Sequence, residues 1–562
     1  MAKISKLIFY FIQSGFFFMI AGCANQMTPG GGDIDKTPPQ IIESFPLNGT
    51  VNYDKNYFEI VFSEYVVKSS VQNSVFISPA LEKPLEYDWS GKSLTVYFSD
   101  TLKKNTTYTI SIGTDVQDIN NSNKMAEAYT FAFSTGNKID KGRISGRIYD
   151  QNSEGLMIFC YRESGKEIDP SNQKPDYISQ SGKNGKYSLL GLGEGSYKVF
   201  PINDKQRNSK YQKNQDEFGV QFKDIVLDEK FNEAINVDFF LTKEDTIAPQ
   251  ISNVIMKNRN NFIVEFMDVI DSLSTGASNF YLYDSLSGKK ILPGYFFKGD
   301  AKPLQYYLGF ADSLDPGGNW ILTSSGIPDP AANISGEEKN KITVKNERDT
   351  VSLKILRAEG ELPAGKVDFE KAELNLRLNK GLDSVNLKRR LTIEDSKGEK
   401  FTYKIKRVDD AFYKISVVPA LKQSTEYKLN LDLRNYTDYC GNRVDSLFQS
   451  KFTTSNELDF SGAAGDVSVL SDTSDVIVVL QNASDRKLKY SQKTGTKKNF
   501  DFKKVIPGKY IVWGFKDENR NNKYDQGQII PFKLSEEFKY YPDTLNLRAR
   551  WPVGGISLQF EK

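Results

Sequence analysis

The stretch Phe58-Glu59-Ile60-Val61-Phe62-Ser63-Glu64 and the later stretch Phe131-Ala132-Phe133-Ser134-Thr135 decide the fold of this chain. Large apolar side chains occupy every second position in both, which is the period of a strand with one buried face. Similar short runs rich in aromatic and β-branched residues recur along the sequence, broken by Asn, Asp, Gly and Lys. This pattern is typical of short antiparallel strands. We therefore predict an all-β protein built from tandem antiparallel β-sandwiches.

The two quoted stretches belong to a unit that occurs again later in the chain. In the first copy Leu102 precedes Tyr108 by six residues, and in the later copy Leu421 precedes Tyr427 by the same spacing. The later copy closes on an aromatic and threonine pattern like that of the first: Phe448, Phe452, Thr453 and Thr454. Internal similarity of this kind indicates a repeat architecture.

A degenerate third copy lies between these two. Residues 248–251 (Ala-Pro-Gln-Ile) match the opening of the first copy, and residues 263–266 (Ile-Val-Glu-Phe) match its early strand, but the closing FxT pattern is missing. A polar turn occurs at residues 118–121 of the first copy and at residues 438–442 of the later copy. Three related units are therefore expected.

These units resemble the bacterial Ig-like modules that open on DxxPP or DxxAP, carry an FSE strand and end on FxT. Residues 35–39 read Asp-Lys-Thr-Pro-Pro, residues 245–249 read Asp-Thr-Ile-Ala-Pro, and Phe62-Ser63-Glu64 supplies the FSE. The resemblance covers roughly half of the mature chain and implies an Ig-like fold. It does not imply one activity, because such sandwiches serve as spacers, adhesins and accessories of enzymes.

A second type of unit occurs twice and aligns without a gap. Six residues of the earlier copy, Gly195, Tyr197, Asp204, Asn208, Lys210 and Tyr211, correspond to Gly508, Tyr510, Asp517, Asn521, Lys523 and Tyr524. This unit resembles the transthyretin-like or carboxypeptidase-regulatory-like fold, which implies a seven-stranded sandwich. The hairpin at residues 181–187 lacks the acidic residue of that family's pattern.

Together these repeats predict a chain of five sandwiches behind an N-terminal signal. Domains of globular proteins run to about 50–200 residues, so 562 residues require several cores. The predicted parts are a lipoprotein signal peptide (1–22), a lipidated tether (23–36), Ig-like module 1 (37–137), transthyretin-like module 2 (138–244), degenerate Ig-like module 3 (245–346), Ig-like module 4 (347–457) and transthyretin-like module 5 (458–562).

The N-terminus has the features of a secretory signal. Lys3 and Lys6 precede the apolar run of residues 7–20, and small residues lead to Cys23. The segment resembles a bacterial lipobox, which implies that Cys23 becomes the acylated first residue and carries a diacylglycerol and an amide-linked acyl chain. Several acyl chains are what stable membrane anchoring requires. The alternatives are a signal cleaved elsewhere or a short membrane span that carries a cysteine.

Resemblance to lipoproteins of diderm bacteria also predicts the location. Ala24 follows the cysteine at a position where Asp would signal retention in the inner membrane, so we expect the outer membrane. Residues 29–32 (Pro-Gly-Gly-Gly) suit a flexible tether. Whether the chain faces the periplasm or the cell surface stays open.

Composition excludes several chemistries. The 74 Lys and Arg balance the 72 Asp and Glu, so no net positive field attracts nucleic acid. The chain has no histidine, which excludes Ser-His-Asp and Cys-His catalysis and His-ligated zinc within it. Cys160 and Cys440 fall in different predicted modules, so a disulfide between them is open but not favoured.

One loop offers ligands for a calcium ion. Side-chain oxygens occur at EF-hand-like positions, and Lys523 supplies a backbone carbonyl: the candidate ligands are Asp517, Asn519, Asn521, Lys523 and Asp525. Gln528 stands where a bidentate glutamate normally completes the shell. The alternative is an Asn-rich turn whose side chains bind their own backbone. No other metal or cofactor is indicated.

Nothing in the sequence selects a catalytic pair. Glu64, Glu265 and Asp268 lie in or just after predicted edge strands, where a solvated face or a turn is the usual role. Sugar binding would need exposed aromatic rings, and the four Trp form no evident cluster. We predict a non-enzymatic lipoprotein acting as a structural or interaction scaffold, for example as a subunit of an outer-membrane protein machine. Its expected partners are the membrane and proteins of the outer membrane or envelope. The alternative is a surface adhesin or glycan-binding accessory protein.

Overall fold

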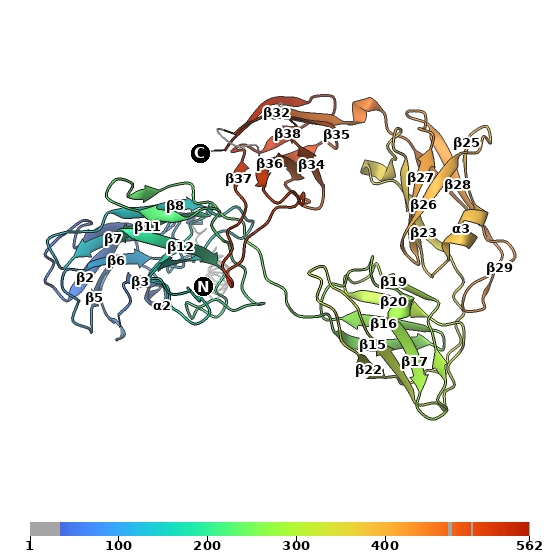
Figure 1. Ribbon diagram of the computed structural model, residues 1–562, viewed down its shortest axis with the longest axis horizontal. Helices are drawn as coiled ribbons and strands as arrows, with labels where there is room; N and C mark the ends of the chain where they lie inside the picture. The colour runs from blue at the N-terminus through green and yellow to red at the C-terminus, as the bar shows by residue number, and fades with distance from the viewer. Residues whose placement is uncertain (1–33, 82, 470–474, 496–497, 561–562) are drawn as a thin grey trace, which may run out of the picture. The chain divides into compact units, whose positions relative to one another are not determined.

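The computed structural model describes residues 34–81, 83–469, 475–495 and 498–560. It divides into two compact units. Of the described residues, unit 1 comprises those of 34–210 and 224–241, and unit 2 comprises 211–223 and those of 242–560. Unit 1 is coloured blue to green in Figure 1, and most of unit 2 runs from green to red.

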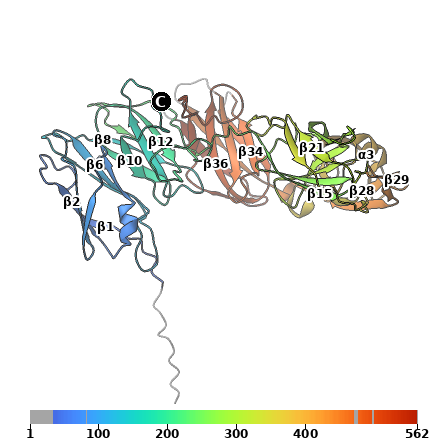
Figure 2. The same cartoon turned by 90° about the horizontal axis from the view of Figure 1, so that it is seen from below.

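Module 1 is a sandwich of a four-stranded and a three-stranded sheet. The sheets have the orders β1-β2-β5-β4 and β3-β6-β7, and the short helix α2 (Lys68–Gln72) precedes β3. Figure 2 shows β1, β2 and β6 from a second side. The strands are β1 (Ile41–Phe45), β2 (Tyr57–Phe62), β3 (Val75–Ser78), β4 (Glu86–Ser90), β5 (Ser93–Tyr97), β6 (Thr107–Ile112) and β7 (Tyr129–Ser134).

The core of module 1 is formed by the alternating residues of the two quoted stretches. Phe58, Ile60 and Phe62 of β2 and Phe131 and Phe133 of β7 are fully buried. The ring centroids of Phe58 and Phe131 lie 5.8 Å apart in an edge-on arrangement, which is one that aromatic pairs prefer. The period of two therefore predicted the buried face correctly.

Module 4 has the same strand order as module 1. Its sheets are β23-β24-β27-β26 and β25-β28-β31, with helix α3 (Ser384–Arg390) before β25 and an additional small hairpin, β29-β30. The strands are β23 (Ile355–Glu359), β24 (Glu373–Leu378), β25 (Leu391–Asp395), β26 (Thr402–Asp409), β27 (Phe412–Val418), β28 (Glu426–Asp432), β29 (Tyr436–Thr437), β30 (Arg443–Val444) and β31 (Leu447–Thr453).

Identical hydrogen bonds explain the recurring Tyr and Thr of these two modules. The Tyr108 hydroxyl accepts from the amide of Lys103 at 2.9 Å, and the Thr135 hydroxyl donates to the Lys103 carbonyl at 2.6 Å. In module 4, the amide of Lys422 donates to the Tyr427 hydroxyl at 3.0 Å, and the Thr454 hydroxyl donates to the Lys422 carbonyl at 2.6 Å. The threonine of FxT thus fastens the loop that precedes β6 or β28.

Module 3 consists of the sheets β15-β16-β20-β19 and β18-β17-β21-β22. Its strands β15, β16, β20 and β19 take the order that β1, β2, β5 and β4 take in module 1. The strands are β15 (Ile251–Asn258), β16 (Asn261–Phe266), β17 (Phe280–Asp284), β18 (Lys290–Ile291), β19 (Tyr295–Lys298), β20 (Gln305–Gly309), β21 (Trp320–Ser324) and β22 (Glu338–Lys341).

Modules 2 and 5 share a different topology. Module 2 has the sheets β10-β9-β12-β13 and β11-β8-β14, and module 5 has β34-β33-β36-β37 and β35-β32-β39, with β38 also on β36. The strands of module 2 are β8 (Gly142–Arg147), β9 (Met157–Arg162), β10 (Tyr177–Gln180), β11 (Lys186–Leu192), β12 (Gly195–Ile202), β13 (Ile225–Leu227) and β14 (Glu233–Ala234). Those of module 5 are β32 (Ser461–Val469), β33 (Asp475–Asn482), β34 (Lys489–Lys493), β35 (Asn499–Val505), β36 (Gly508–Asp517), β37 (Phe538–Tyr540), β38 (Leu545–Leu547) and β39 (Val553–Phe560).

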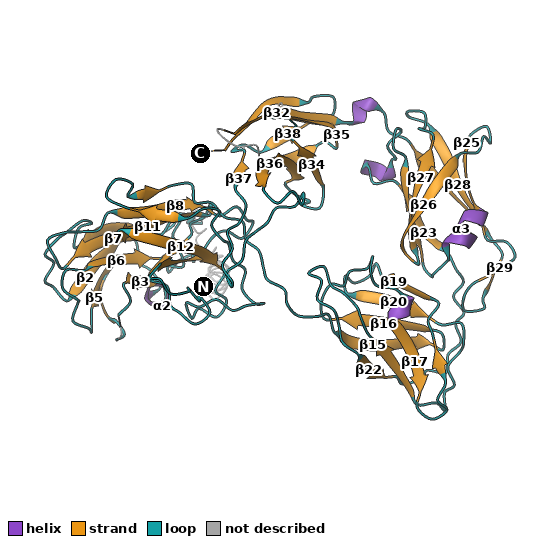
Figure 3. Cartoon of the chain, viewed as in Figure 1, coloured by secondary structure: helices purple, strands orange, loops and turns teal. Residues whose placement is uncertain are grey.

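The all-β prediction is confirmed, with one difference in detail. Figure 3 shows strands throughout and only short helical turns, among them η1 (Ala277–Asn279), η2 (Pro363–Gly365) and η3 (Glu457–Asp459). The expected antiparallel pairing holds between the named strands of the described residues except for β8 with β14 and β32 with β39, which are parallel. Parallel neighbours need a long connection, and here most of the module lies between them.

Each helix in the described part of the chain is too short or too polar to cross a membrane. The predicted anchor at Cys23 lies outside the described residues.

Candidate functional site

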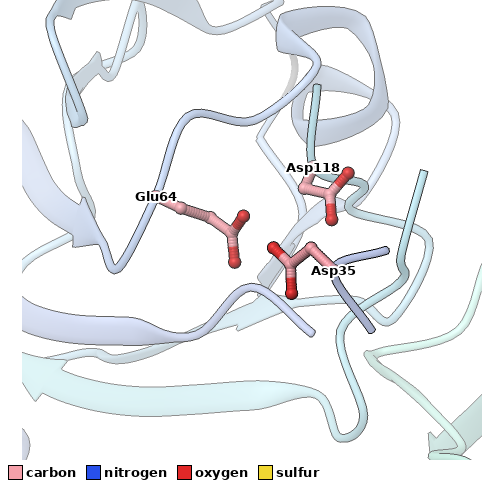
Figure 4. Close-up of side chains that lie close together, drawn as sticks. All are labelled: Asp35, Glu64 and Asp118. Atoms are coloured by element: carbon pink, nitrogen blue, oxygen red, sulfur yellow. The ribbon is translucent and has the colours of Figure 1, made fainter. Parts of the chain in front are cut away.

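Three carboxylates, two from module 1 and one from the segment just before it, meet at one end of the module 1 sandwich. Asp35 precedes β1, Glu64 comes two residues after β2, and Asp118 lies in the loop between β6 and β7. One carboxylate oxygen from each lies within 4.8 Å of the others, and Figure 4 shows the three groups facing one another. Asp118 is fully buried, Glu64 is half-buried and Asp35 is exposed.

Hydrogen bonds fix the two aspartates of this acidic cluster. The Asp35 carboxylate accepts from the amide of Thr37 at 2.8 Å, and the Asp118 carboxylate accepts from the amide of Asn121 at 2.7 Å. The side-chain amide of Asn123 donates to Asp118 Oδ2 at 2.7 Å and to the Asp35 carbonyl at 3.0 Å. The segment before β1 and the β6–β7 loop are therefore held together.

The pKa values of two carboxyls in the acidic cluster are shifted in opposite directions. Burial opposes ionisation of Asp118, but the hydrogen bonds from Asn121 and Asn123 outweigh it and hold the pKa of this carboxyl below its usual value. Burial and the charges of Asp118 and Asp35 raise the pKa of Glu64. The raised pKa shows that the negative charge of Glu64 is poorly compensated beside the two other carboxylates. A cation that binds oxygen ligands would reduce the repulsion between these charges.

Comparison with known proteins gives a family for this part of the chain. Residues 35–135 match a bacterial Ig-like domain. The matched range begins at the first carboxylate of the acidic cluster and ends at the threonine of FxT. No curated protein sequence matches the chain.

Solved structures give only distant similarities. The N-terminal part of the bacterial S-layer protein SbsC is 16% identical, covering 37% of this chain and 45% of its own, with a TM-score of 0.17. Domains 1–6 of SbsC are 11% identical over 91% of this chain and 67% of that one, with a TM-score of 0.16. A tetra-tandem repeat from a large adhesion protein is 14% identical over 71% and 99%, with a TM-score of 0.15. The chain thus spans less than half of the first structure.

The acidic cluster of the bacterial Ig-like domain was missed by sequence reasoning. Asp35 and Glu64 were interpreted as markers of the fold, and Glu64 was expected on a solvated face or in a turn. In the structure Glu64 points toward two other carboxylates. The available signal was that the opening Asp recurs at Asp245 and the polar turn recurs at residues 438–442, since polar side chains kept at separate places of a repeated unit can share one location.

The predicted calcium loop of module 5 forms a tight turn. The Asp517 carboxylate is buried and accepts from the amides of Asn521 and Asn522 at 3.0 and 3.1 Å. The side-chain amides of Asn519 and Asn521 donate to Asp525, and the Asn521 side-chain oxygen accepts from the amide of Lys523 at 2.7 Å. The loop oxygens thus serve as acceptors within the turn, and calcium binding there stays a prediction.

The corresponding loop of module 2 keeps the bonds that the Asp and Asn side chains accept from the backbone of the turn. The Asp204 carboxylate accepts from the amides of Asn208 and Ser209 at 3.3 and 2.8 Å, and Asn208 accepts from the amide of Lys210 at 3.0 Å. In this loop glutamines replace two of the oxygen positions, yet the turn is kept. The recurring Asp and Asn are therefore sufficiently explained by the turn.

The described cysteines are both free thiols. Cys160 is buried in the core of module 2. Cys440 is half-buried, and burial raises the pKa of its thiol to about 11. A thiol this basic is a poor nucleophile at neutral pH.

Proposed function

We propose that this chain is a non-catalytic, lipid-anchored scaffold of the cell envelope, held at the outer membrane through Cys23. The observation that carries the proposal is the role of the side chains that recur between copies. Tyr108 and Tyr427 bind loop backbone in the Ig-like modules, and Asp204 and Asp517 bind turn backbone in the other type. Repeated residues thus hold sandwiches in shape, which suits a series of spacers that presents loops and strand edges to protein partners.

The anchor is tested with the full precursor in a diderm bacterial host grown with an alkyne-labelled fatty acid. We expect label in the wild-type chain and none in a Cys23→Ser variant, which should leave the membrane fraction. Label in the variant, or membrane partition of the unlabelled variant, would contradict the anchor. A Cys160→Ser variant controls for general effects of cysteine removal.

The scaffold role is tested by crosslinking in intact cells followed by mild detergent extraction of the native lipoprotein. We expect envelope or outer-membrane proteins to be recovered with the wild-type chain and to be lost when only modules 3 to 5 are deleted. Recovery of the chain without protein partners would contradict a scaffold.

An open groove in unit 1 favours a glycan-binding role as the second candidate. The groove has a volume of about 950 Å³ and is lined by aromatic and charged side chains that include Tyr129, Arg143, Arg147, Tyr149 and Lys186. Tyrosine rings and charged groups that line an open groove can stack on and hydrogen-bond to sugar rings. Retention of the mature chain on a polysaccharide array, lost in an Arg147→Ala variant, would support this role over the scaffold.

A further inference from the structure

The three positions of the acidic cluster recur in module 4. In both modules the first strand has the same bulge, pairing Ile41 with Phe62 and Ile355 with Leu378. Counting from these pairs, Asp349 takes the place of Asp35, six residues before the first isoleucine. Lys380 takes the place of Glu64, two residues after the second strand. Asp438 occupies the later loop as Asp118 does.

The hydrogen bonds confirm this equivalence. The Asp349 carboxylate accepts from the amide two residues later, that of Val351, at 3.2 Å, as Asp35 accepts from Thr37. The amide of Asp438 donates to the Asn442 carbonyl at 2.9 Å, and that of Asp118 donates to the Asn123 carbonyl at 3.1 Å. Asn442 therefore corresponds to Asn123.

In module 4 the site holds a cation that belongs to the chain. The Lys380 ammonium donates to Asp438 Oδ2 at 2.9 Å and to Asp349 Oδ2. All three side chains are buried, with at most 6% of their surface exposed. The side-chain amide of Asn442 also donates to Asp349 Oδ2 at 2.9 Å. A buried ammonium between these two carboxylates shows that the location accepts positive charge.

Module 1 has the two aspartates and the asparagine but lacks the ammonium. Two carboxylates and one ammonium give module 4 a formal charge of minus one at this location, whereas three carboxylates give module 1 minus three. A divalent cation would restore minus one. The nearby Lys92 ammonium donates to the Ser63 carbonyl at 2.7 Å.

We propose that module 1 binds a Ca²⁺ ion through Asp35, Glu64 and Asp118, at the place that the Lys380 ammonium occupies in module 4. Calcium prefers carboxylate and carbonyl oxygens and accepts water in the remaining positions, and the exposed Asp35 side leaves room for water. Magnesium requires a near-ideal octahedron and loses its water reluctantly, so three side chains from separate segments suit it less.

Module 3 supplies a natural comparison. The side-chain amide of Asn333 donates to Asp329 at 2.8 Å and to the Asp245 carbonyl at 3.0 Å, as Asn123 does in module 1. The position of Glu64 is taken by Asp268, which is one methylene shorter and exposed. Within the described residues these three carboxylates do not come within 4.8 Å of one another. We therefore expect no calcium at module 3.

The ion would join the end of the predicted lipid tether to the sandwich. Asp35 belongs to the segment that enters β1, and Asp118 belongs to the β6–β7 loop. Binding would hold these two segments together more firmly than the bonds of Asn123 alone.

The test is calcium titration of the mature chain by isothermal calorimetry after removal of metal with a chelator, using a Cys23→Ser background for solubility. We expect Glu64→Gln, which keeps the shape of the side chain, to weaken Ca²⁺ binding by at least about tenfold or abolish it. Glu59→Gln, on the exposed face of β2, is the matched control and should bind as the parent chain does. Unchanged binding in Glu64→Gln overturns the proposal.

Further measurements separate the possible sources of a calcium signal. Asp517→Asn removes the other candidate loop, and a signal lost there but kept in Glu64→Gln overturns the proposal. Hydrogen exchange of peptides from residues 34–45 and 113–124 should slow with Ca²⁺ in the parent chain only. Glu64→Lys should fold, since module 4 has Lys at this position, and should show no calcium response. An equal response to Mg²⁺ overturns the assignment to calcium.

Discussion

Modules 1 and 4 share a strand order, a bulge in the first ladder and a Tyr–Thr fastening, yet their ends at Asp118 and Asp438 are electrostatically different. In module 4 a buried lysine neutralises two aspartates, whereas in module 1 a glutamate adds a third negative charge. The same fold can therefore neutralise this pair of carboxylates with a charged side chain of its own, or leave the pair free to bind a cation from solution.

The largest effect is expected from breaking the lysine bridge of module 4. Lys380→Met leaves Asp349 and Asp438 buried without a counter-charge, and removing one partner of a buried pair costs about 3–5 kcal/mol. Hydrogen exchange of peptides from β24 and β28 should become much faster in the full chain. Lys404→Met, at an exposed position of β26, is the control. Equal protection in both variants would refute the structural role of the bridge.

A smaller, stabilising effect is expected when module 1 is converted to the arrangement of module 4. Glu64→Lys places an ammonium beside Asp118 and Asp35, and charge-assisted hydrogen bonds contribute about 1.5–3 kcal/mol. Because Asp35 is exposed, we expect the lower end of that range, about 1.5 kcal/mol, in metal-free buffer. Thermal melting with hydrogen exchange of β6 measures it. A loss of protection would show that the two locations are not equivalent.

The shared Tyr fastening predicts equal effects in the two modules. Tyr108→Phe and Tyr427→Phe each remove the acceptor for one loop amide, and a net hydrogen bond contributes about 1 kcal/mol. Exchange of the Lys103 and Lys422 amides should accelerate to a similar degree. A difference of more than about tenfold between them, or 1.4 kcal/mol, would contradict a common role.

The smallest effect concerns pH. In metal-free buffer, acidification from neutral pH through the raised pKa of Glu64 should stabilise module 1, because the folded state takes up this proton before the unfolded chain does. In module 4 burial opposes ionisation of Asp349, but the hydrogen bonds from Lys380 and the Val351 amide and the charge of Lys380 together outweigh it and lower the pKa of Asp349. The contribution of Asp349 to stability is therefore present above the ordinary value of 3.8 and is lost as the pH falls below it. At alkaline pH the pKa of Lys380 is raised above its ordinary value of 10.5. Its contribution to the stability of module 4 is therefore fully present below pH 10.5 and is lost as the pH rises through the raised pKa.

Module-resolved hydrogen exchange at pH 7 and at about pH 5, corrected for the intrinsic exchange rate, measures this contrast. Destabilisation of module 1 over that range would contradict the assigned direction for Glu64.

Local patterns were enough to predict the strands and the repeats. Alternation in residues 58–64 placed Phe58, Ile60 and Phe62 in the core, and the Leu102–Tyr108 spacing marked a loop that the Tyr hydroxyl fastens. The parallel pairing of β8 with β14 was not predicted, since strand direction within a sheet depends on which strands become neighbours across the whole module.

The sequence predicted only part of the candidate functional residues. The loop at Asp517 was predicted from ligand spacing, and the structure shows these side chains bonding to their own turn. The acidic cluster was overlooked because Asp35, Glu64 and Asp118 lie far apart in the sequence and each had an adequate local explanation.

The all-β character, the two kinds of repeating unit and the exclusion of histidine chemistry follow from the amino-acid sequence alone, because strand periodicity and residue counts are local or additive properties. That three acids distant in the sequence face one another at module 1, and that Lys380 takes the place of one of them in module 4, depends on the packing of the folded chain. The reason is physical: charges interact through space over a few ångströms, and the packing of two sheets sets which loops come that close.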